Sequence, residues 1–189
     1  MIRGIIFDCF GVLYRGSIAH LSELAPVANR AELANLSLSS DYGYLSHSDF
    51  LEQASVLIEK TPAEIQSIMN MDHIRNEAMI DYVRSLRADY KIALLSNIGQ
   101  GVIERLFSSA ELDELFDAVI LSGDVGMVKP DMAIFSLTSD KLGVSAEECL
   151  MVDDLQANID GAVMAGMQAV VFTTTERFLS DVQMFVGSR

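Results

Sequence analysis

The chain has 189 residues, half of them hydrophobic, and its formal net charge at pH 7 is −14. This length and composition predict one globular domain with a good core and room for a small insert, and they exclude a disordered chain. The acidic charge argues against nucleic acid or an anionic membrane surface as a partner, because both bind basic surfaces. No apolar run reaches the roughly 18 residues of a membrane-spanning helix, and a cytoplasmic location is expected.

The first predicted element is a strand over residues 2–8, which ends at the carboxylate of Asp8. Its short apolar run is typical of a strand that is buried on both faces of a parallel sheet. Ligands of such sheets bind just beyond the carboxyl ends of the strands. Asp8 is therefore a candidate for chemistry.

A long helical region follows the first strand. Residues from about 16 to 86 show helical periodicity and no convincing strand. The segment 20–35 predicts a helix, and 41–44 predicts a turn between helices. Thr61 and Glu64 form a capping-box pattern that predicts the start of a further helix.

Strand and helix signals alternate in the rest of the chain. Strands are predicted at 91–95, 118–121, 149–152 and 169–172. Helices are predicted around Val102, Ile103, Leu106 and Phe107, over 131–142, from 155 to about 166, and at the C-terminus, with a glycine-bearing loop at 122–126. This alternation predicts an α/β fold, a doubly wound, parallel, five-stranded Rossmann-like sheet with an inserted all-helical cap. The expected core is 1–14 and 89–189, and the expected cap is 15–88.

Polar residues recur where the predicted strands end. Asp8, Ser96 and Asp153 each end a strand, and Lys129 lies in the loop after another. The carboxyl ends of parallel strands lie at one edge of a sheet, so these residues are expected to converge on one crevice. Together they supply a nucleophile, a hydroxyl, a cation and a carboxylate.

Four segments resemble the motifs of the haloacid dehalogenase superfamily. They are Phe7-Asp8-Cys9-Phe10-Gly11-Val12-Leu13, Leu95-Ser96-Asn97, Lys129-Pro130-Asp131 with its lead-in 122–126, and Val152-Asp153-Asp154 followed by Asn158, Gly161-Ala162 and Ala165-Gly166-Met167. Their order, and their places at strand ends, make the resemblance specific. It covers the whole core, and the helical insert is similar to the small helical cap of the family.

The resemblance implies a role for each residue at the strand ends. Asp8 would be the nucleophile that forms an aspartyl ester intermediate. Ser96, with backbone amides near Asn97 and Gly11, would bind the transferring group. Lys129 would balance negative charge beside the nucleophile and in the transition state.

A magnesium site is expected beside the nucleophile. Asp153 and Asp154 would repel each other and Asp8 without a counter-charge, and Mg²⁺ favours a few carboxylates together with waters and a substrate phosphate. The resemblance implies that Asp8, the backbone carbonyl of Phe10 and Asp153 hold the metal. Asp154 would bind through water or support these ligands.

Phe10 departs from the phosphatase pattern of the family. Phosphatases usually carry there a second aspartate, whose acid–base help is worth about 10²- to 10⁴-fold. Three interpretations follow: a slow Mg²⁺-dependent phosphatase, a metal-independent 2-haloacid dehalogenase, or a fold that binds a ligand or partner without turnover. Halide leaves without a proton, and dehalogenases carry an aromatic residue at the place of Phe10. They also carry a serine-type residue where this chain has Asp153.

The carboxylates favour the phosphatase, since placing several anions in one crevice without a cation costs free energy. The expected substrate is a small phosphorylated metabolite, and sugar phosphates follow from family analogy alone. Phe10 is also expected to contact this substrate. Replacing Phe10 with aspartate is expected to raise turnover. The sequence carries no signal for an oligomeric state.

Two further patterns concern Cys9 and the cap. Cys9 and Arg15 match the C-x₅-R spacing of cysteine-dependent phosphatases, but the residues between them are mostly apolar, which argues against that chemistry. Cys9 and Cys149 are expected to be buried thiols. The cap is expected to exclude water and to contact the leaving group. Its candidate contacts are Arg15, His20, Arg30, Tyr42, Tyr44 and His47.

Overall fold

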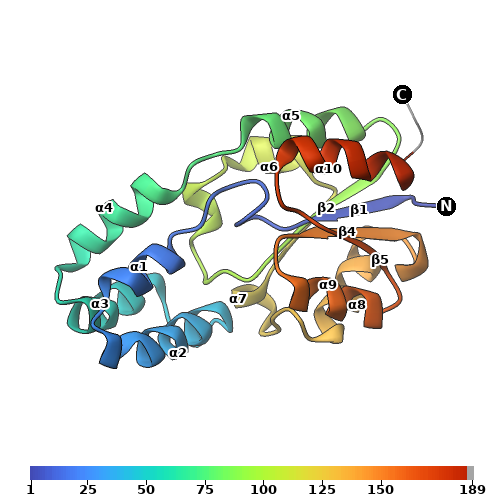
Figure 1. Cartoon of the computed structure of the whole chain (residues 1–189). Coiled ribbons are helices and arrows are strands. Elements are labelled where there is room, and N and C mark those ends of the chain that lie inside the picture. The colour runs from blue at the N-terminus through green and yellow to red at the C-terminus, as the bar shows by residue number, and fades with distance from the viewer. Residues whose placement is uncertain (187–189) are drawn as a thin grey trace.

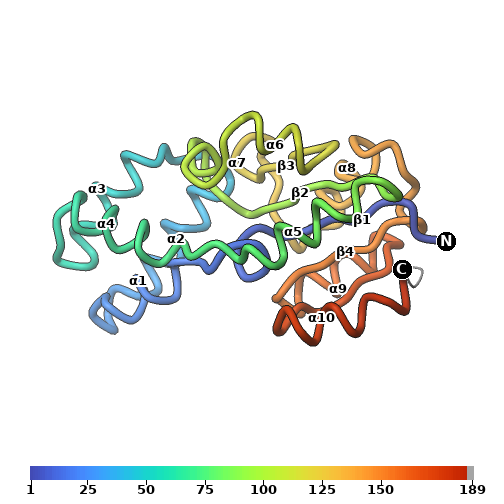
Figure 2. Tube along the Cα trace, turned by 90° about the horizontal axis from the view of Figure 1, so that it is seen from above, coloured from blue at the N-terminus to red at the C-terminus, as the bar shows by residue number. Residues whose placement is uncertain are grey.

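A sheet of five parallel strands lies at the centre of the computed structural model, which describes residues 1–186. The strands are β1 (Gly4–Phe7), β2 (Lys91–Ser96), β3 (Ala118–Leu121), β4 (Cys149–Asp153) and β5 (Gln168–Val171). Their order is β3-β2-β1-β4-β5 (Figures 1 and 2). The predicted five-stranded parallel α/β sheet is therefore confirmed.

Helices cover both faces of this sheet. They are α5 (Glu77–Leu86), α6 (Ser109–Leu115), α7 (Ser122–Val125), α8 (Met132–Leu142), α9 (Gln156–Met164) and α10 (Thr175–Asp181), with 3₁₀ turns at Ile103–Arg105, Ala146–Glu148 and Val182–Met184. Ile5 and Phe7 of β1 pack in one cluster with α5, α6 and α10, whereas Ile6 packs with α8 and α9 (Figure 1). Successive side chains of a strand point to opposite faces, so β1 is apolar at each position. None of the helices described combines the length and apolar character that crossing a bilayer requires.

The strand register places the polar ends side by side. Phe7 of β1 pairs with Leu94 on one side and with Val152 on the other. The next residue, Asp8, is therefore level with Leu95 and Asp153. Both carboxylates lie at the edge of the sheet that faces the four helices α1 (Ile18–Leu24), α2 (Arg30–Asp41), α3 (His47–Ile58) and α4 (Pro62–Asp72).

These four helices form a layer of their own beyond the strand ends (Figure 2). Their buried side chains make a separate core, which includes Leu21, Leu33, Phe50 and Ile65. Thr61 starts α4 with the predicted capping box, because its side chain accepts from the Glu64 N–H while Glu64 accepts from the Thr61 N–H. The inserted helical region is thus packed as a small unit with its own apolar interior.

The expected cap, 15–88, includes α5 as its last helix, but in the structure α5 does not pack with the other helices of this region. Met79, Ile80 and Val83 of α5 pack against the sheet in the cluster of β1, not with α1 to α4. Helical periodicity marks a buried face, and it does not say which neighbour that face packs on. The predicted helix at 20–35 is also two helices, separated by a 3₁₀ turn at Val27–Asn29 after Pro26.

Two predictions in the core were wrong in detail. Val102, Ile103 and Phe107 are buried, but only a 3₁₀ turn forms there, and the next helix begins after Ser108, whose side chain accepts from the Glu111 N–H. The predicted loop at 122–126 is instead the single helical turn α7, which Gly126 closes in a left-handed conformation (φ 67°). Both segments are too short for periodicity to distinguish a turn of helix from a loop.

Candidate active site

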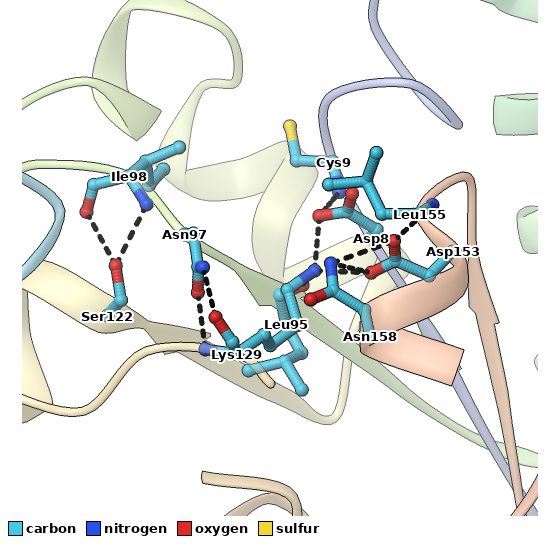
Figure 3. Close-up of polar contacts among 10 residues, drawn as sticks. All are labelled: Asp8, Cys9, Leu95, Asn97, Ile98, Ser122, Lys129, Asp153, Leu155 and Asn158. Atoms are coloured by element: carbon cyan, nitrogen blue, oxygen red, sulfur yellow. Dashed lines mark hydrogen bonds and ion pairs between the residues drawn. The ribbon is translucent and has the colours of Figure 1, made fainter. Parts of the chain in front are cut away.

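Asp8 presents one carboxylate oxygen to the protein and the other to a cavity. Its Oδ1 accepts from the Cys9 N–H at 2.7 Å and lies 2.8 Å from Nζ of Lys129 (Figure 3). Among the described residues, no hydrogen-bond donor reaches Oδ2. Asp8 is 5% exposed, and it lines the cavity between the sheet and the helical layer. Its fixed oxygen orients the carboxylate and leaves the other oxygen for a ligand.

Lys129 forms ion pairs with carboxylates at the ends of the first and fourth strands. Its Nζ lies 2.6 Å from Oδ2 of Asp153 as well as 2.8 Å from Asp8, and the side chain is almost fully buried. The loop that carries Lys129 is held by Asn97, whose side chain accepts from the Lys129 N–H at 2.8 Å and donates to the Lys129 carbonyl at 2.9 Å. Asn97 therefore positions the lysine backbone.

Asp153 is held by more donors than any other carboxylate of this group. Oδ1 accepts from the Leu155 N–H at 2.9 Å and from Nδ2 of Asn158 at 2.9 Å, while Oδ2 accepts from Lys129 and, at 3.0 Å, from Asn158 (Figure 3). A carboxylate has about four lone-pair positions, so these contacts nearly fill its capacity. The role of Asn158 in orienting Asp153 follows from the tertiary structure; the sequence marked Asn158 only as part of a motif.

Asp154 completes a set of three carboxylates. Ligand oxygens of Asp8, Asp153 and Asp154 lie within 4.8 Å of one another. An all-oxygen set of this kind fits a hard divalent cation such as Mg²⁺. Asp153 accepts most of its hydrogen bonds from the protein, whereas Asp154 is less buried, so Asp154 offers the more open oxygens of these two carboxylates.

Burial and mutual repulsion perturb the titration of this group. Burial raises the pKa of Asp8, Asp153 raises it further, and Lys129 opposes both. Burial also raises the pKa of Asp154, again with a contribution from Asp153. Although burial opposes its charge, the two carboxylates raise the pKa of Lys129. A cation bound beside these carboxyls would lower the pKa of both Asp8 and Asp154, because it favours their charged forms.

Cys9 has the properties of an inert thiol. Its side chain is fully buried, and burial together with the neighbouring Asp8 raises its pKa well above the usual value. A thiol is a nucleophile only as a thiolate. This agrees with the sequence-based argument against C-x₅-R chemistry, and both cysteines are free, buried thiols as predicted.

A cavity of about 300 Å³ lies in front of Asp8. The core side of its wall includes Ser96, Asn97, Lys129 and Asn158, and the helical layer contributes Ser37, Ser40, Asp41, His47 and His73. Phe10 lies between these two sides, with its ring centroid 4.8 Å from that of His73. The cavity therefore has a charged end at the strands and a neutral-to-acidic end at the helices.

Of the six predicted cap contacts, only His47 lines this cavity. Tyr42 and Tyr44 stack on each other instead, with ring centroids 5.5 Å apart. Arg30 donates to backbone carbonyls of its own layer. His20 and Arg15 pair with Asp72, and Arg15 lines a neighbouring cavity that also contains Asp154.

Gly11 has a different place from the one expected. Its N–H donates to the Tyr14 carbonyl at 2.7 Å within the turn, so this amide is not free to bind a transferring group. Gly11 instead lies against the Asp154 carboxylate. The sequence also missed Asp41 and His73, because no local pattern marks a helix end as part of a distant cavity.

The chain matches known proteins in sequence and in fold. The model of the haloacid dehalogenase-like hydrolase family matches residues 2–166. Fructose-1-phosphate phosphatase YqaB of Escherichia coli is 28% identical over 120 residues, which cover 64% of this chain and 63% of that protein. The chain covers less than two thirds of the length of the first curated relatives that it matches.

Two solved structures share the fold. A predicted HAD-like family hydrolase from Porphyromonas gingivalis is 27% identical, with a TM-score of 0.80 over 100% of both chains. The HAD family enzyme bt-2542 from Bacteroides thetaiotaomicron, solved with magnesium and inorganic phosphate, has a TM-score of 0.76 at 19% identity and covers 93% of this chain and 96% of that one. With the strand-end residues assembled as the motifs imply, the chain belongs to the haloacid dehalogenase-like hydrolases.

Proposed function

We propose that the protein is a Mg²⁺-dependent phosphatase of a small phosphorylated metabolite. The observation that carries this proposal is the Asp8 carboxylate, with Oδ1 held by Cys9 and Lys129 and with Oδ2 open to the cavity beside two further carboxylates. The E. coli relative is a fructose-1-phosphate phosphatase, and the Bacteroides structure contains magnesium and phosphate, which supports the same class of reaction. A sugar phosphate is the substrate that this analogy favours.

The reaction would proceed in two steps at Asp8. Oδ2 attacks phosphorus, the bond between phosphorus and the leaving oxygen breaks, and an aspartyl phosphate and an alkoxide form; the alkoxide must gain a proton. Water then attacks the phosphoryl group, loses a proton, and restores the Asp8 carboxylate as phosphate leaves. Ser96 and the backbone N–H of Asn97 would hold phosphoryl oxygens, and Lys129 would stabilise the transferred charge.

The chain offers the ligands that a magnesium ion would need. Asp8, the Phe10 carbonyl, Asp153 and Asp154 would hold it, with Asp153 oriented by Asn158. When bound, Mg²⁺ neutralises charge on the phosphoryl group and among the carboxylates. The helices α1 to α4 would act as the cap, since they form the far wall of the cavity.

A haloacid dehalogenase is the second candidate, because the aromatic wall of Phe10 and His73 would suit a halide that needs no proton. The helical side of the cavity argues against it. A cation would favour binding of the carboxylate of a 2-haloacid, yet among the described residues that line the cavity Lys129 is the only lysine or arginine, and it is held between Asp8 and Asp153. The helical layer presents the carboxylate of Asp41 instead.

Release of phosphate from p-nitrophenyl phosphate and from fructose 1-phosphate tests the proposal. We expect turnover with Mg²⁺, loss with a chelator, and loss in Asp8→Asn, whereas the exposed-site control Asp140→Asn keeps the activity. Chloride release from 2-chloropropionate, or phosphate release that the chelator does not change, would overturn it.

A further inference from the structure

Asp41 is the acidic residue that the helical layer contributes to the cavity. It is the last residue of α2, and it lines the cavity together with Asp8, Ser96 and Lys129. No hydrogen bond or ion pair holds its carboxylate within the described part of the chain. A partly buried carboxylate without a protein donor is available to a ligand.

The end of α2 is held against the loops of the core. A Cβ atom on Gly99 would lie 2.3 Å from Oγ of Ser40, and one on Gly43 would lie 2.2 Å from the carbonyl oxygen of Gly123. Gly99 follows the loop of Ser96 and Asn97, and Gly123 belongs to α7 after β3. These close approaches on both sides of Asp41 fix its backbone relative to the strand ends.

Asp41 lies on the side of the cavity where the leaving group must be. The phosphoryl group would be bound at Asp8 and Lys129, so the remainder of the ester extends toward the helices. Phe10, at the place of the usual acid, carries no proton to give. His73 faces the Phe10 ring, and its Nε2 lies 3.2 Å from Oγ of Ser17.

We propose that Asp41 is the acid–base residue of the reaction, supplied by the cap in place of Phe10. This proposal rests on the phosphatase function proposed above. In the first step the Asp41 carboxyl donates its proton to the leaving oxygen as the bond to phosphorus breaks, so that the alcohol departs and Asp41 becomes a carboxylate. In the second step this carboxylate takes a proton from the attacking water, and phosphate leaves as Asp8 and protonated Asp41 are restored.

The electrostatics of the cavity suit this role. Burial raises the pKa of Asp41 to about 7, while the charge of Lys129 opposes the rise. The other titratable side chains that line the cavity are Asp8, His47 and His73. Burial lowers the pKa of both histidines, so they are neutral near pH 7 and leave the two carboxyls and Lys129 as the groups that interact there. An acid–base group is most effective when its pKa is near the working pH.

Substitution of Asp41 tests the proposal through the leaving group. Acid catalysis matters for an alkyl ester, whose alkoxide needs a proton, and little for p-nitrophenyl phosphate, whose leaving group is stable as an anion. We expect Asp41→Asn to lower kcat/KM, which reports the first step, by about 10²-fold or more on fructose 1-phosphate and by about threefold at most on p-nitrophenyl phosphate. Because the second step is common to both esters and also uses Asp41, kcat should fall on both. The rate of the second step falls toward acidic pH where Asp41 is protonated, and this part of its pH profile should also change in the variant.

Two further variants complete the experiment. Glu32→Gln removes an exposed carboxylate from the same helix and should leave both rates unchanged. Asp41→Ala should recover part of its lost rate on the alkyl ester when formate is added. An equal loss of kcat/KM on both esters, or no loss on either, would overturn the role of Asp41 while the phosphatase function stands. A wild-type protein without Mg²⁺-dependent turnover of either ester would overturn both proposals.

Discussion

Gly11 lies against the carboxylate of Asp154, so close that a Cβ atom at Gly11 would be 2.2 Å from Cγ of Asp154. Gly11 also has a φ of +97°, a conformation that residues with a side chain rarely adopt. The turn after β1 and the loop after β4 therefore approach each other through a glycine. This approach keeps Asp154 beside Asp8 and Asp153.

Gly11→Ala should displace Asp154 and weaken the proposed metal site. We expect the affinity for Mg²⁺, measured by isothermal titration calorimetry, to fall about 10-fold or more, as is usual when a ligand loses its support. Gly101→Ala is the matched control, because Gly101 has a φ of +76° and nothing within 4 Å of the added Cβ. Equal Mg²⁺ affinity in the two variants would show that the contact with Asp154 has no part in binding.

Lys129→Met should destabilise the protein strongly. It leaves Asp8 and Asp153 buried beside each other without their shared cation, and removal of one partner from a buried ion pair typically costs about 3–5 kcal/mol. Urea denaturation in the presence of a chelator measures the loss. Lys141→Met, at an exposed position of α8, should change the free energy of unfolding little; a similar loss there would mean that the buried pairs are not the cause.

Phe10→Asp should raise turnover of alkyl phosphates, because it adds a carboxyl group two residues after the nucleophile. If Asp41 already supplies the proton, the gain will be small in the wild-type background and largest in Asp41→Asn, where about 10-fold recovery or more is expected. Steady-state kinetics of the single and double variants measure this. A gain that is the same in both backgrounds would mean that the two carboxyls act independently.

Cys9→Ser should leave phosphatase activity unchanged within about threefold, since the native thiol is buried and protonated. Iodoacetamide should label Cys9 in the unfolded protein and not in the folded one, as mass spectrometry of peptides can show. Rapid labelling of the native protein together with loss of activity would restore the cysteine-dependent alternative.

His73 should make the protein less stable in mild acid. Burial lowers its pKa, with Asp72 opposing, so below its ordinary value of about 6.5 the unfolded chain binds a proton that the folded chain does not. Stability is therefore lost as the pH falls through 6.5 toward the lowered value. His73→Asn should reduce the loss of melting temperature between pH 7.5 and pH 5. An unchanged loss in the variant would contradict the prediction.

Much of the core could be predicted because its signals are local. The apolar run before Asp8 and the one before Asp153 each mark a buried strand, and a strand's end is visible where the run stops. In a parallel sheet those ends lie at one edge, so Lys129 and Ser96 could be assigned to the same crevice. Prediction failed at 102–107 and 122–126, where single turns are too short to show a period.

The sequence by itself determined the alternation of strands and helices, and with it the edge of the sheet at which Asp8, Ser96, Lys129 and Asp153 meet. Only the tertiary structure decided which of these oxygens remain open, since Asn158 and Lys129 donate to Asp153, while the described donors to Asp8 all reach Oδ1. It also decided which residues of the helical layer line the cavity. Asp41 reaches the cavity through contacts between the end of α2 and core loops distant in sequence, and such long-range packing leaves no periodic pattern in the chain.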